Sequence, residues 1–227
     1  MKLSASIMAH RKRQAEAEEL QASLDRDVPI VYDPEPEPSK DPAQRWITGR
    51  MAWEAHDPGA DYHLVIQDDA LACADLISGL EKALDVLGPK GLVCAYSGTG
   101  KPHQAHIKRA IAHATDKGHS WWCSRSLCWG VAIIAPVNTI GPMLKWGSHK
   151  SRMHVNYDKK IGIYYRDVKK WCTWYPNPSL VDHRDGESLV GHGTTAATGR
   201  RAHSFHTGSA LDVDWTRTPP HGLSVRT

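Results

Sequence analysis

Short apolar runs alternate with helical patterns through the first hundred residues, and this alternation restricts the fold more than any other feature. Runs with the length of strands occur at 3–9 (LSASIMA), 28–32 (VPIVY), 63–67 (HLVIQ) and 92–97 (LVCAYS). Between them, apolar residues repeat at helical spacing over 13–24, 44–56 and 71–87. This order predicts an α/β fold with a mostly parallel sheet and helices on both sides. Ligands of such folds bind at the carboxyl ends of strands, where Asp33, Asp68 and Asp69 stand.

The second half of the chain continues the pattern less regularly. We expect helices at 107–115 and 139–145, an apolar strand at 131–136, and a helix and a short strand within 159–181. The 227 residues, 41% of them hydrophobic, suffice for one core. We therefore expect a single domain over residues 1–207 and a flexible tail over 208–227, where Gly, Ser, Thr and Pro are frequent.

Several classes of protein are disfavoured by composition. No apolar run approaches the roughly 20 residues of a membrane helix, and no charged-apolar-small leader opens the chain, so we expect a cytoplasmic protein. The five cysteines are an odd number without a CxxC pair, which disfavours a disulfide framework and a zinc ribbon. We expect them to be buried free thiols.

Charge is distributed unevenly along the chain. Residues 1–100 hold 10 Lys and Arg against 17 Asp and Glu, whereas residues 101–170 hold 13 against 3. A block this basic either forms a positive surface for a polyanion or is an ordinary solvated face. The residues that would contact a nucleic acid are Lys101, Arg125, Lys145, Lys150, Arg152, Lys159 and Lys160.

Three segments place reactive side chains near predicted strand ends or helices. HLVIQDDA ends on Asp68 and Asp69, two carboxylates that suit a hard divalent cation, although an acidic turn is the simpler reading. PSLVDHRD presents His183, a metal ligand or a satisfied histidine, beside Arg184, whose guanidinium suits phosphate. In VNYDKKI, the flanking lysines favour the ionised form of Asp158, as a general base requires, although a solvated ion pair would look the same.

Taken in order, these segments resemble a known family. SIMAHRKR, DPAQRWITGRMAWEAH, HLVIQDDALACADL, WGVAIIAP, NTIGPMLKW, VNYDKKIGIYY and PSLVDHRDGESLVGH run colinearly with small phage-encoded glycosyltransferases of the GT-A type. The likeness spans roughly residues 3–205 and is greatest to TET-associated DNA glycosyltransferases, which attach sugar to 5-hydroxymethylcytosine. It implies a GT-A type (Rossmann-like) α/β fold.

The resemblance also implies a metal site. The strand-end motif of the family binds a divalent metal, Mn²⁺ or Mg²⁺, and here it reads Gln67-Asp68-Asp69 in place of a strict Asp-x-Asp. It implies Asp69 and His183 as metal ligands and Asp68 as a contact of the ribose or the metal. Arg184 would balance the diphosphate charge or pair with Asp182 or Asp185.

Further residues are implied to bind the donor, a UDP-sugar. His10 and Arg13 would lie beside the nucleotide, Arg13 on a phosphate, and Asp33 would contact the base or ribose. Arg50 and Trp53, three apart on a helix, would both face the donor, with Trp53 in the core as the alternative. Trp129 and Gly130 would lie against the sugar, with Trp129 in the core as the alternative. Asp158 would act as the catalytic base.

The implied reaction transfers a sugar by direct displacement to 5-hydroxymethylcytosine in double-stranded phage DNA, in the infected host's cytoplasm, after a TET-like dioxygenase has hydroxylated the base. The acceptor base would be extruded from the duplex, and Trp121-Trp122 or Tyr164-Tyr165 would stack on it or fill the gap, with the core as the alternative place for these rings. Two alternatives remain: a glycosyltransferase with a carbohydrate or protein acceptor, and a non-catalytic nucleic-acid-binding domain.

Overall fold

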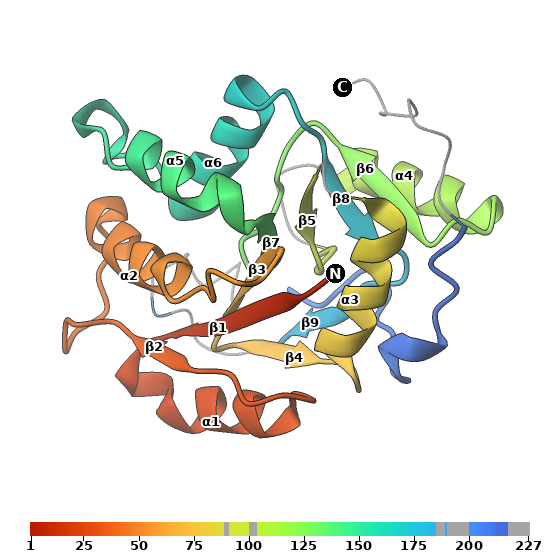
Figure 1. Ribbon diagram of the computed structural model, residues 1–227, viewed down its shortest axis with the longest axis horizontal. Coiled ribbons are helices and arrows are strands. Elements are labelled where there is room, and N and C mark those ends of the chain that lie inside the picture. Colours follow the sequence, from red (N-terminus) through yellow and green to blue (C-terminus); the bar gives the residue numbers. More distant parts are fainter. Residues whose placement is uncertain (89–90, 100–103, 185–188, 190–199, 218–227) are drawn as a thin grey trace.

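One central sheet organises the molecule. The computed structural model describes residues 1–88, 91–99, 104–184, 189 and 200–217, and within these ranges seven strands form a sheet in the order β2-β1-β3-β7-β5-β8-β6. Five strands point the same way, while β7 and β6 run antiparallel to their neighbours. The predicted α/β class with a mostly parallel sheet is confirmed (Figure 1). The strands are β1 (Leu3–Ala9), β2 (Ile30–Tyr32), β3 (Tyr62–Gln67), β5 (Leu92–Cys94), β6 (Trp121–Ser124), β7 (Ala132–Pro136) and β8 (Thr173–Pro176).

Helices cover both sides of this sheet (Figure 1). On one side α2 (Pro42–Glu54), α5 (Val137–Gly147) and α6 (Tyr157–Ile163) pack against one another. On the other side α1 (Gln14–Ser23) and α3 (Leu76–Leu87) are joined where the Asp25 carboxylate accepts hydrogen bonds from the backbone N–H groups of Ile77 and Ser78. Helix α4 (Gln104–Asp116) lies beside β6. The remaining elements are short: η1 (Arg11–Arg13), η2 (Lys150–Arg152), η3 (Tyr164–Val168) and η5 (Ala210–Asp212).

A buried histidine joins β1, β3 and α2. His63 lies in β3 with no exposed surface, and its Nδ1 is 2.9 Å from the Ser4 hydroxyl. Its Nε2 is 3.0 Å from the carbonyl oxygen of Ala52, which can only accept, so Nε2 carries the proton and Nδ1 accepts from Ser4. Burial lowers the pKa of His63 to about 4. The core therefore requires the neutral ring.

We predict that His63 makes the fold sensitive to acid. Between pH 6.5 and 4 the unfolded chain protonates this ring and the folded chain does not, so the free energy of unfolding falls as pH falls, by about 3 kcal/mol over the window. Urea unfolding at several pH values would measure this, with His63→Gln as the comparison. The variant should lose stability at pH 7 but show a shallower decline below pH 6.5. Parallel pH profiles would contradict the assignment.

Two short strands differ from the sequence-based expectation. The segment expected to open a helix at Leu71 begins instead with β4 (Ala70–Ala72), which pairs antiparallel with β9 (Val181–His183). Strand β6 was not expected, because its two tryptophans suggest a stacking surface. Pairing with β8 buries Trp121 and Trp122, and Trp122 stacks on Tyr175 with ring centroids 4.1 Å apart.

The other aromatic pair proposed to stack on a base is also internal. Tyr164 and Tyr165 are buried, and the hydroxyl groups of Tyr165 and Thr139 are 2.6 Å apart. The expectation that either pair stacks on an extruded base is therefore wrong, because all four rings pack within the protein.

Part of the expected tail is packed against the domain. Ala210 in η5 is fully buried, and a Cβ on Gly79 of α3 would lie only 2.2 Å from the Ala210 Cβ. Trp215 is 4% exposed and its ring lies 5.1 Å from that of Trp121. The chain is therefore ordered against α3 and β6 through residue 217, because these contacts bury apolar surface; residues 218–227 lie outside the described part.

We expect Trp215→Ala to lower the free energy of unfolding by about 3–5 kcal/mol, the usual range for removing a buried tryptophan. Leu211→Ala, at an exposed position of the same segment, is the matched control and should change it by less than about 1 kcal/mol. Urea denaturation compares the two. Equal effects would mean that Trp215 does not anchor the segment.

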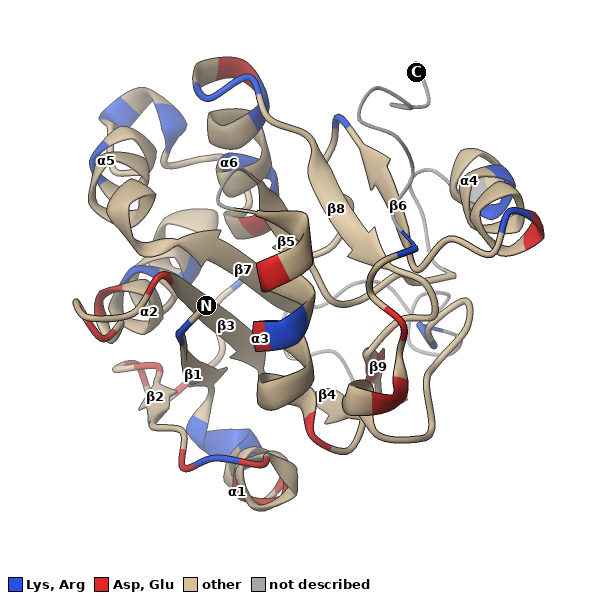
Figure 2. Cartoon of the chain, turned by 45° about the vertical axis from the view of Figure 1, so that its right-hand side comes forward, with Lys and Arg blue, Asp and Glu red and all other residues tan. Residues whose placement is uncertain are grey.

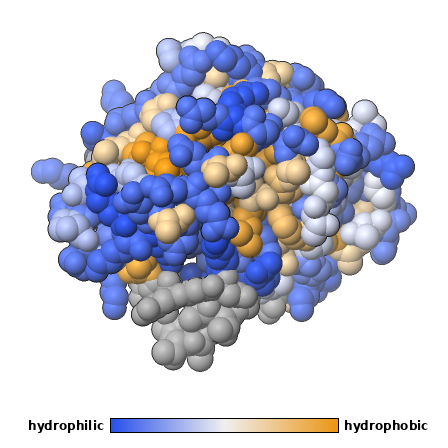
Figure 3. Space-filling view, turned by 90° about the horizontal axis from the view of Figure 1, so that it is seen from below, coloured by the Kyte–Doolittle hydropathy of each residue, from blue (hydrophilic) through white to orange (hydrophobic). Residues whose placement is uncertain are grey.

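The surface gives little further indication of function. Within the described ranges, no helix is long and apolar enough to cross a membrane. Four of the five cysteines are buried, as expected, and Cys172 is half-buried. The face in Figure 3 is mostly hydrophilic with small, separate apolar areas.

Candidate functional site

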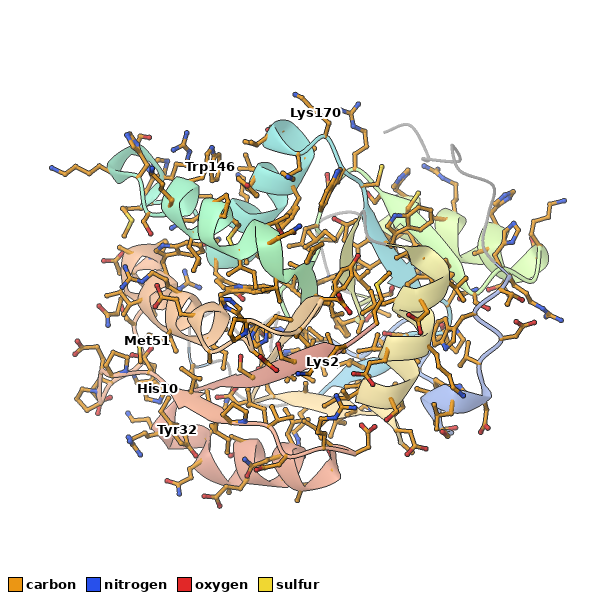
Figure 4. The ribbon with its side chains drawn as sticks, in the orientation of Figure 1. Lys2, His10, Tyr32, Met51, Trp146 and Lys170 are labelled. Carbon is orange, nitrogen blue, oxygen red and sulfur yellow. The ribbon has the colours of Figure 1, made fainter. Side chains whose placement is uncertain are left out.

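The polar residues predicted from strand ends gather along one edge of the sheet. His10 follows β1, Asp33 follows β2 and Asp68 follows β3, and these three strands are parallel. Because β7 is antiparallel to β3, its first residues lie at the same edge, and Gln67 N–H donates to the carbonyl of Val131. Gly130 is thereby brought to this edge. Figure 4 places His10 and Tyr32 together here, away from Lys2 at the start of β1.

Arg13 holds the two adjacent carboxylates at the centre of this edge. Its Nη1 donates to Asp69 Oδ2 at 2.5 Å and to Asp68 Oδ1 at 3.2 Å. Asp68 Oδ2 accepts from the backbone N–H of His10 at 2.9 Å. Burial, and then the neighbouring charge of Asp69, raise the pKa of Asp68 to about 6, against the opposing effects of His10 and Arg13. The two carboxylates therefore lie in a site that favours added positive charge.

His183 reaches the same carboxylate from the far end of the chain. Pairing of β4 with β9 places Ala70 opposite His183, and His183 Nε2 lies 3.4 Å from Asp69 Oδ2. His183 Nδ1 is 2.6 Å from the carbonyl oxygen of Arg184, so in the neutral ring Nδ1 carries the proton and Nε2 has the lone pair. Asp69 Oδ1 is buried without a hydrogen-bond partner among the described residues.

The donor atoms of Asp69 and His183 suit a divalent cation whose other coordination positions are taken by a bound substrate or water. A buried carboxylate oxygen without a partner in the described part of the chain and a nearby imidazole lone pair are both suitable metal donors. Within the described residues, no group of three or more His, Cys, Asp or Glu side chains could hold a metal. Asp69 and His183 would therefore need oxygen atoms from a substrate or water to complete the coordination shell.

Arg184 and Asp182 have partners other than those expected. Arg184 N–H donates to the carbonyl of Asp69, and its guanidinium pairs with Glu19 of α1 at 2.9 Å. The Asp182 carboxylate pairs with Arg201 at 2.5 Å and accepts from the backbone N–H of His183. The suggested Arg184–Asp182 pair is therefore wrong, since Arg184 pairs with Glu19 and Asp182 with Arg201, and Asp185 lies outside the described residues.

His10 and Asp33 are tied to the backbone of their own turns. His10 is buried and its Nδ1 accepts from Lys12 N–H, which caps η1, while its Nε2 is buried with no partner in the described ranges. Asp33 donates its N–H to Ala9 and accepts from Glu35 N–H through its carboxylate. Both lie at the edge where a nucleotide was expected, and their binding roles stay predictions.

Asp158 lies beside Gly130 and near the side chain of Gln67, the residue that directly precedes the paired carboxylates. A Cβ on Gly130 would lie 3.1 Å from Asp158 Cβ and 3.5 Å from Gln67 Nε2, so three segments of the chain meet here. Asp158 stands in the first turn of α6, is half-buried, and accepts from Lys159 N–H. A side chain at 130 would require Asp158 to move by a few tenths of an ångström, so glycine suits this close approach.

Trp129 belongs to a row of aromatic rings that leads to His183. It is half-buried, and its ring centroid lies 5.6 Å from that of Tyr96, which lies 6.2 Å from the His183 ring. Tyr96 was not predicted as a residue of the site. It lies two residues after β5, and a position at a strand end is the same signal that located Asp68. Trp129 is therefore neither a core residue nor a free surface residue.

Arg50 and Trp53 do not share a face of α2. Arg50 is 51% exposed and pairs with Glu54, whereas Trp53 is fully buried and its indole N–H donates to the Tyr157 hydroxyl at 2.8 Å. Trp53 is therefore a core residue, which is the alternative that the sequence left open, and the donor-binding role of Arg50 stays a prediction.

The comparisons with known proteins add little to this picture. No family model matches the chain, and no curated protein matches it. Among solved structures, a mannose-1-phosphate geranyltransferase from Thermus thermophilus is similar over 78% of this chain and 74% of that one, at 15% identity and a TM-score of 0.38. A likeness this distant carries no argument about function.

The predicted nucleic-acid contacts are partly on the surface. Arg125, Lys145, Lys150 and Lys159 are exposed, and Arg152 lies over the Trp146 ring at 4.0 Å. Figure 2 shows basic residues on α5 and α6 and in the adjoining turns. Lys160 is 1% exposed, on the inner side of α6, with Nζ 4.2 Å from the Trp46 ring centroid. Its assignment to a nucleic-acid surface is wrong; Lys101 lies outside the described residues.

Together these residues can neutralise an anion and accept a proton. Arg13 and His183 contact Asp69, and Asp158 lies beside Gly130, near the side chain of Gln67. A cation-binding group and a separate carboxylate, at one sheet edge, are what a displacement with an anionic leaving group requires.

Proposed function

We propose that this protein is a GT-A type glycosyltransferase that uses a UDP-sugar and a divalent cation. The observation that carries the proposal is that the candidate site has two separate carboxylate groups. Asp69 contacts His183 and Arg13. Asp158 lies beside Gly130. A transferase needs both, because charge develops on the leaving diphosphate while a proton leaves the acceptor hydroxyl.

In this proposal, Asp69 and His183 hold Mn²⁺ or Mg²⁺, which would neutralise charge on the leaving diphosphate. His10 and Asp33 orient the nucleoside, and Arg13 and Arg184 supply positive charge for the phosphates. Asp68 keeps His10 and Arg13 in place through its two hydrogen bonds.

Asp158 acts as the base. The acceptor oxygen bonds to the anomeric carbon as the bond to the diphosphate oxygen breaks, and the hydroxyl proton passes to Asp158. Trp129 contacts the sugar beside Gly130, whose missing side chain leaves room for it.

For the acceptor we propose the hydroxymethyl group of 5-hydroxymethylcytosine in double-stranded phage DNA, made beforehand by a TET-like dioxygenase. The proposal is supported by the exposed basic residues Arg125, Lys145, Lys150 and Lys159, which could hold the phosphate backbone. The test incubates the protein with Mn²⁺, a panel of UDP-sugars and hydroxymethylated duplex DNA, and reads nucleoside masses against unmodified DNA. A hexose-sized gain that requires the hydroxymethyl group would support it.

A carbohydrate acceptor is the second candidate, and one observation favours it. The aromatic residues expected to stack on an extruded base are buried, whereas the half-buried Trp129 could stack on a sugar. DNA binding through phosphates should weaken steeply with salt, whereas transfer to a neutral sugar should not. No mass gain on DNA, with UDP-sugar hydrolysis still present, would favour this second candidate.

A further inference from the structure

The paired carboxylates already have a positive partner within the protein. Arg13 Nη1 lies within hydrogen-bond distance of both Asp68 and Asp69, and its side chain is only 15% exposed. The carboxylate side chains are 9% and 15% exposed. A guanidinium in this position offsets the repulsion between two adjacent buried charges, which is also what a bound cation would do.

Arg13 and a metal ion would compete for the same carboxylate. Asp69 Oδ2 is 2.5 Å from Arg13 Nη1 and 3.4 Å from His183 Nε2, so one oxygen faces both groups. A cation held by Asp69 and His183 would lie close to the guanidinium, and two positive charges at such separations repel strongly when water is largely excluded. Both oxygens of Asp68 are already hydrogen-bonded, which leaves Asp69 Oδ1 as the open position within the described part of the site.

We propose that Arg13 is an exchangeable internal counter-cation, which occupies the carboxylates in the resting site and leaves them when a divalent cation arrives with a nucleotide diphosphate. The inference rests on the proposed function, because it takes the metal and the diphosphate from it. The diphosphate offers Arg13 a replacement partner, since a guanidinium binds phosphate as well as carboxylate.

The exchange of Arg13 makes the binding of the metal and the binding of the diphosphate depend on each other. When the metal binds alone, Arg13 loses its carboxylate partners and gains no other anion. When the metal binds together with a diphosphate, Arg13 can pair with the phosphate groups. The two ligands therefore bind cooperatively, each raising the affinity of the other by the same factor. Arg13 adds to the coupling that the diphosphate provides when its own oxygen atoms coordinate the metal.

The experiment measures Mn²⁺ binding by electron paramagnetic resonance, with and without UDP, in the wild type and Arg13→Gln. In the wild type, UDP should tighten Mn²⁺ binding about tenfold or more. In Arg13→Gln, Mn²⁺ alone should bind about tenfold more tightly than to the wild type, and the added effect of UDP should shrink. Adding Asp69→Asn to this variant should remove the gained binding, which assigns it to this site.

Lys12→Gln is the matched control. Lys12 lies in the same turn, η1, but its ammonium pairs with Glu37 at the surface, so its removal should leave Mn²⁺ affinity unchanged. Melting temperature gives a second measurement: Arg13→Gln should melt lower than the wild type in EDTA and regain more from Mn²⁺. If Arg13→Gln does not fold, Arg13→Lys replaces it, and should bind Mn²⁺ alone more tightly than the wild type, because one ammonium cannot span both carboxylates as the guanidinium does.

Equal Mn²⁺ affinity of the wild type and the Arg13 variant without UDP would overturn the exchange. If the wild type still bound Mn²⁺ in the presence of UDP, the proposed function would stand. Absence of Mn²⁺ binding in every form, with and without UDP, would overturn both the exchange and the metal-dependent reaction.

Discussion

Asp69→Asn should reduce sugar transfer, and hydrolysis of the UDP-sugar, about a thousandfold or more. The substitution keeps the shape of the side chain but removes the negative charge that Arg13 and His183 face. A loss of about 4 kcal/mol of transition-state stabilisation corresponds to this factor. Steady-state kinetics over a range of Mn²⁺ concentrations would measure it, and part of the loss should be recovered at high Mn²⁺.

Asp61→Asn is the control for this substitution. Asp61 immediately precedes β3 and accepts a hydrogen bond from Lys2 N–H at the opposite end of the strand. It should transfer sugar at the wild-type rate. Full activity of Asp69→Asn would contradict the proposed reaction and favour a non-catalytic binding domain.

Asp158→Asn should lower kcat by about 10²–10⁴-fold and leave the KM for the UDP-sugar within about threefold of the wild type. The reason is that Asp158 lies beside Gly130, whereas the residues that would hold the metal and the diphosphate are Asp69, His183 and Arg13. Loss of a base slows proton removal without weakening donor binding. Initial rates at several donor concentrations separate the two constants.

Asp167→Asn provides the comparison, because Asp167 lies in η3 after α6 and pairs with Arg166 at the surface. It should behave as the wild type. A rise in KM with unchanged kcat in Asp158→Asn would show that Asp158 binds the donor and is not the base.

The sequence predicts the site best where one strand supplies it. The ends of apolar runs locate Asp33, Asp68 and Asp69, and these strands are parallel neighbours with their ends at one edge. Asp158 can be singled out by its lysine neighbours, but its approach to Gln67 depends on Gly130 and on the antiparallel direction of β7. Strand direction has no signature in the apolar pattern, so this juxtaposition required the structure.

Long-range partners are the main source of error. Two carboxylates without a basic neighbour in sequence suggest an external cation, yet Arg13 reaches them from the first turn after β1. Lys160 follows Lys159, and the sequence suggests the same exposed role for both, although a helix turns adjacent residues by about 100° and directs Lys160 toward Trp46. Burial lowers the pKa of Lys160 to about 8, which no local pattern indicates.

The pairing of β4 with β9 determines when the site can form during synthesis of the chain. It pairs Ala70 with His183, residues that leave the ribosome far apart in time. Strands β1 to β3 can pair as soon as the first third of the chain has emerged, but Asp69 then has no imidazole beside it. Contacts between distant parts of a chain form late, because a long loop must close first. A nascent or prematurely ended chain would thus carry the paired carboxylates without His183, and the complete cation-binding group would arise only in chains that have folded through β9.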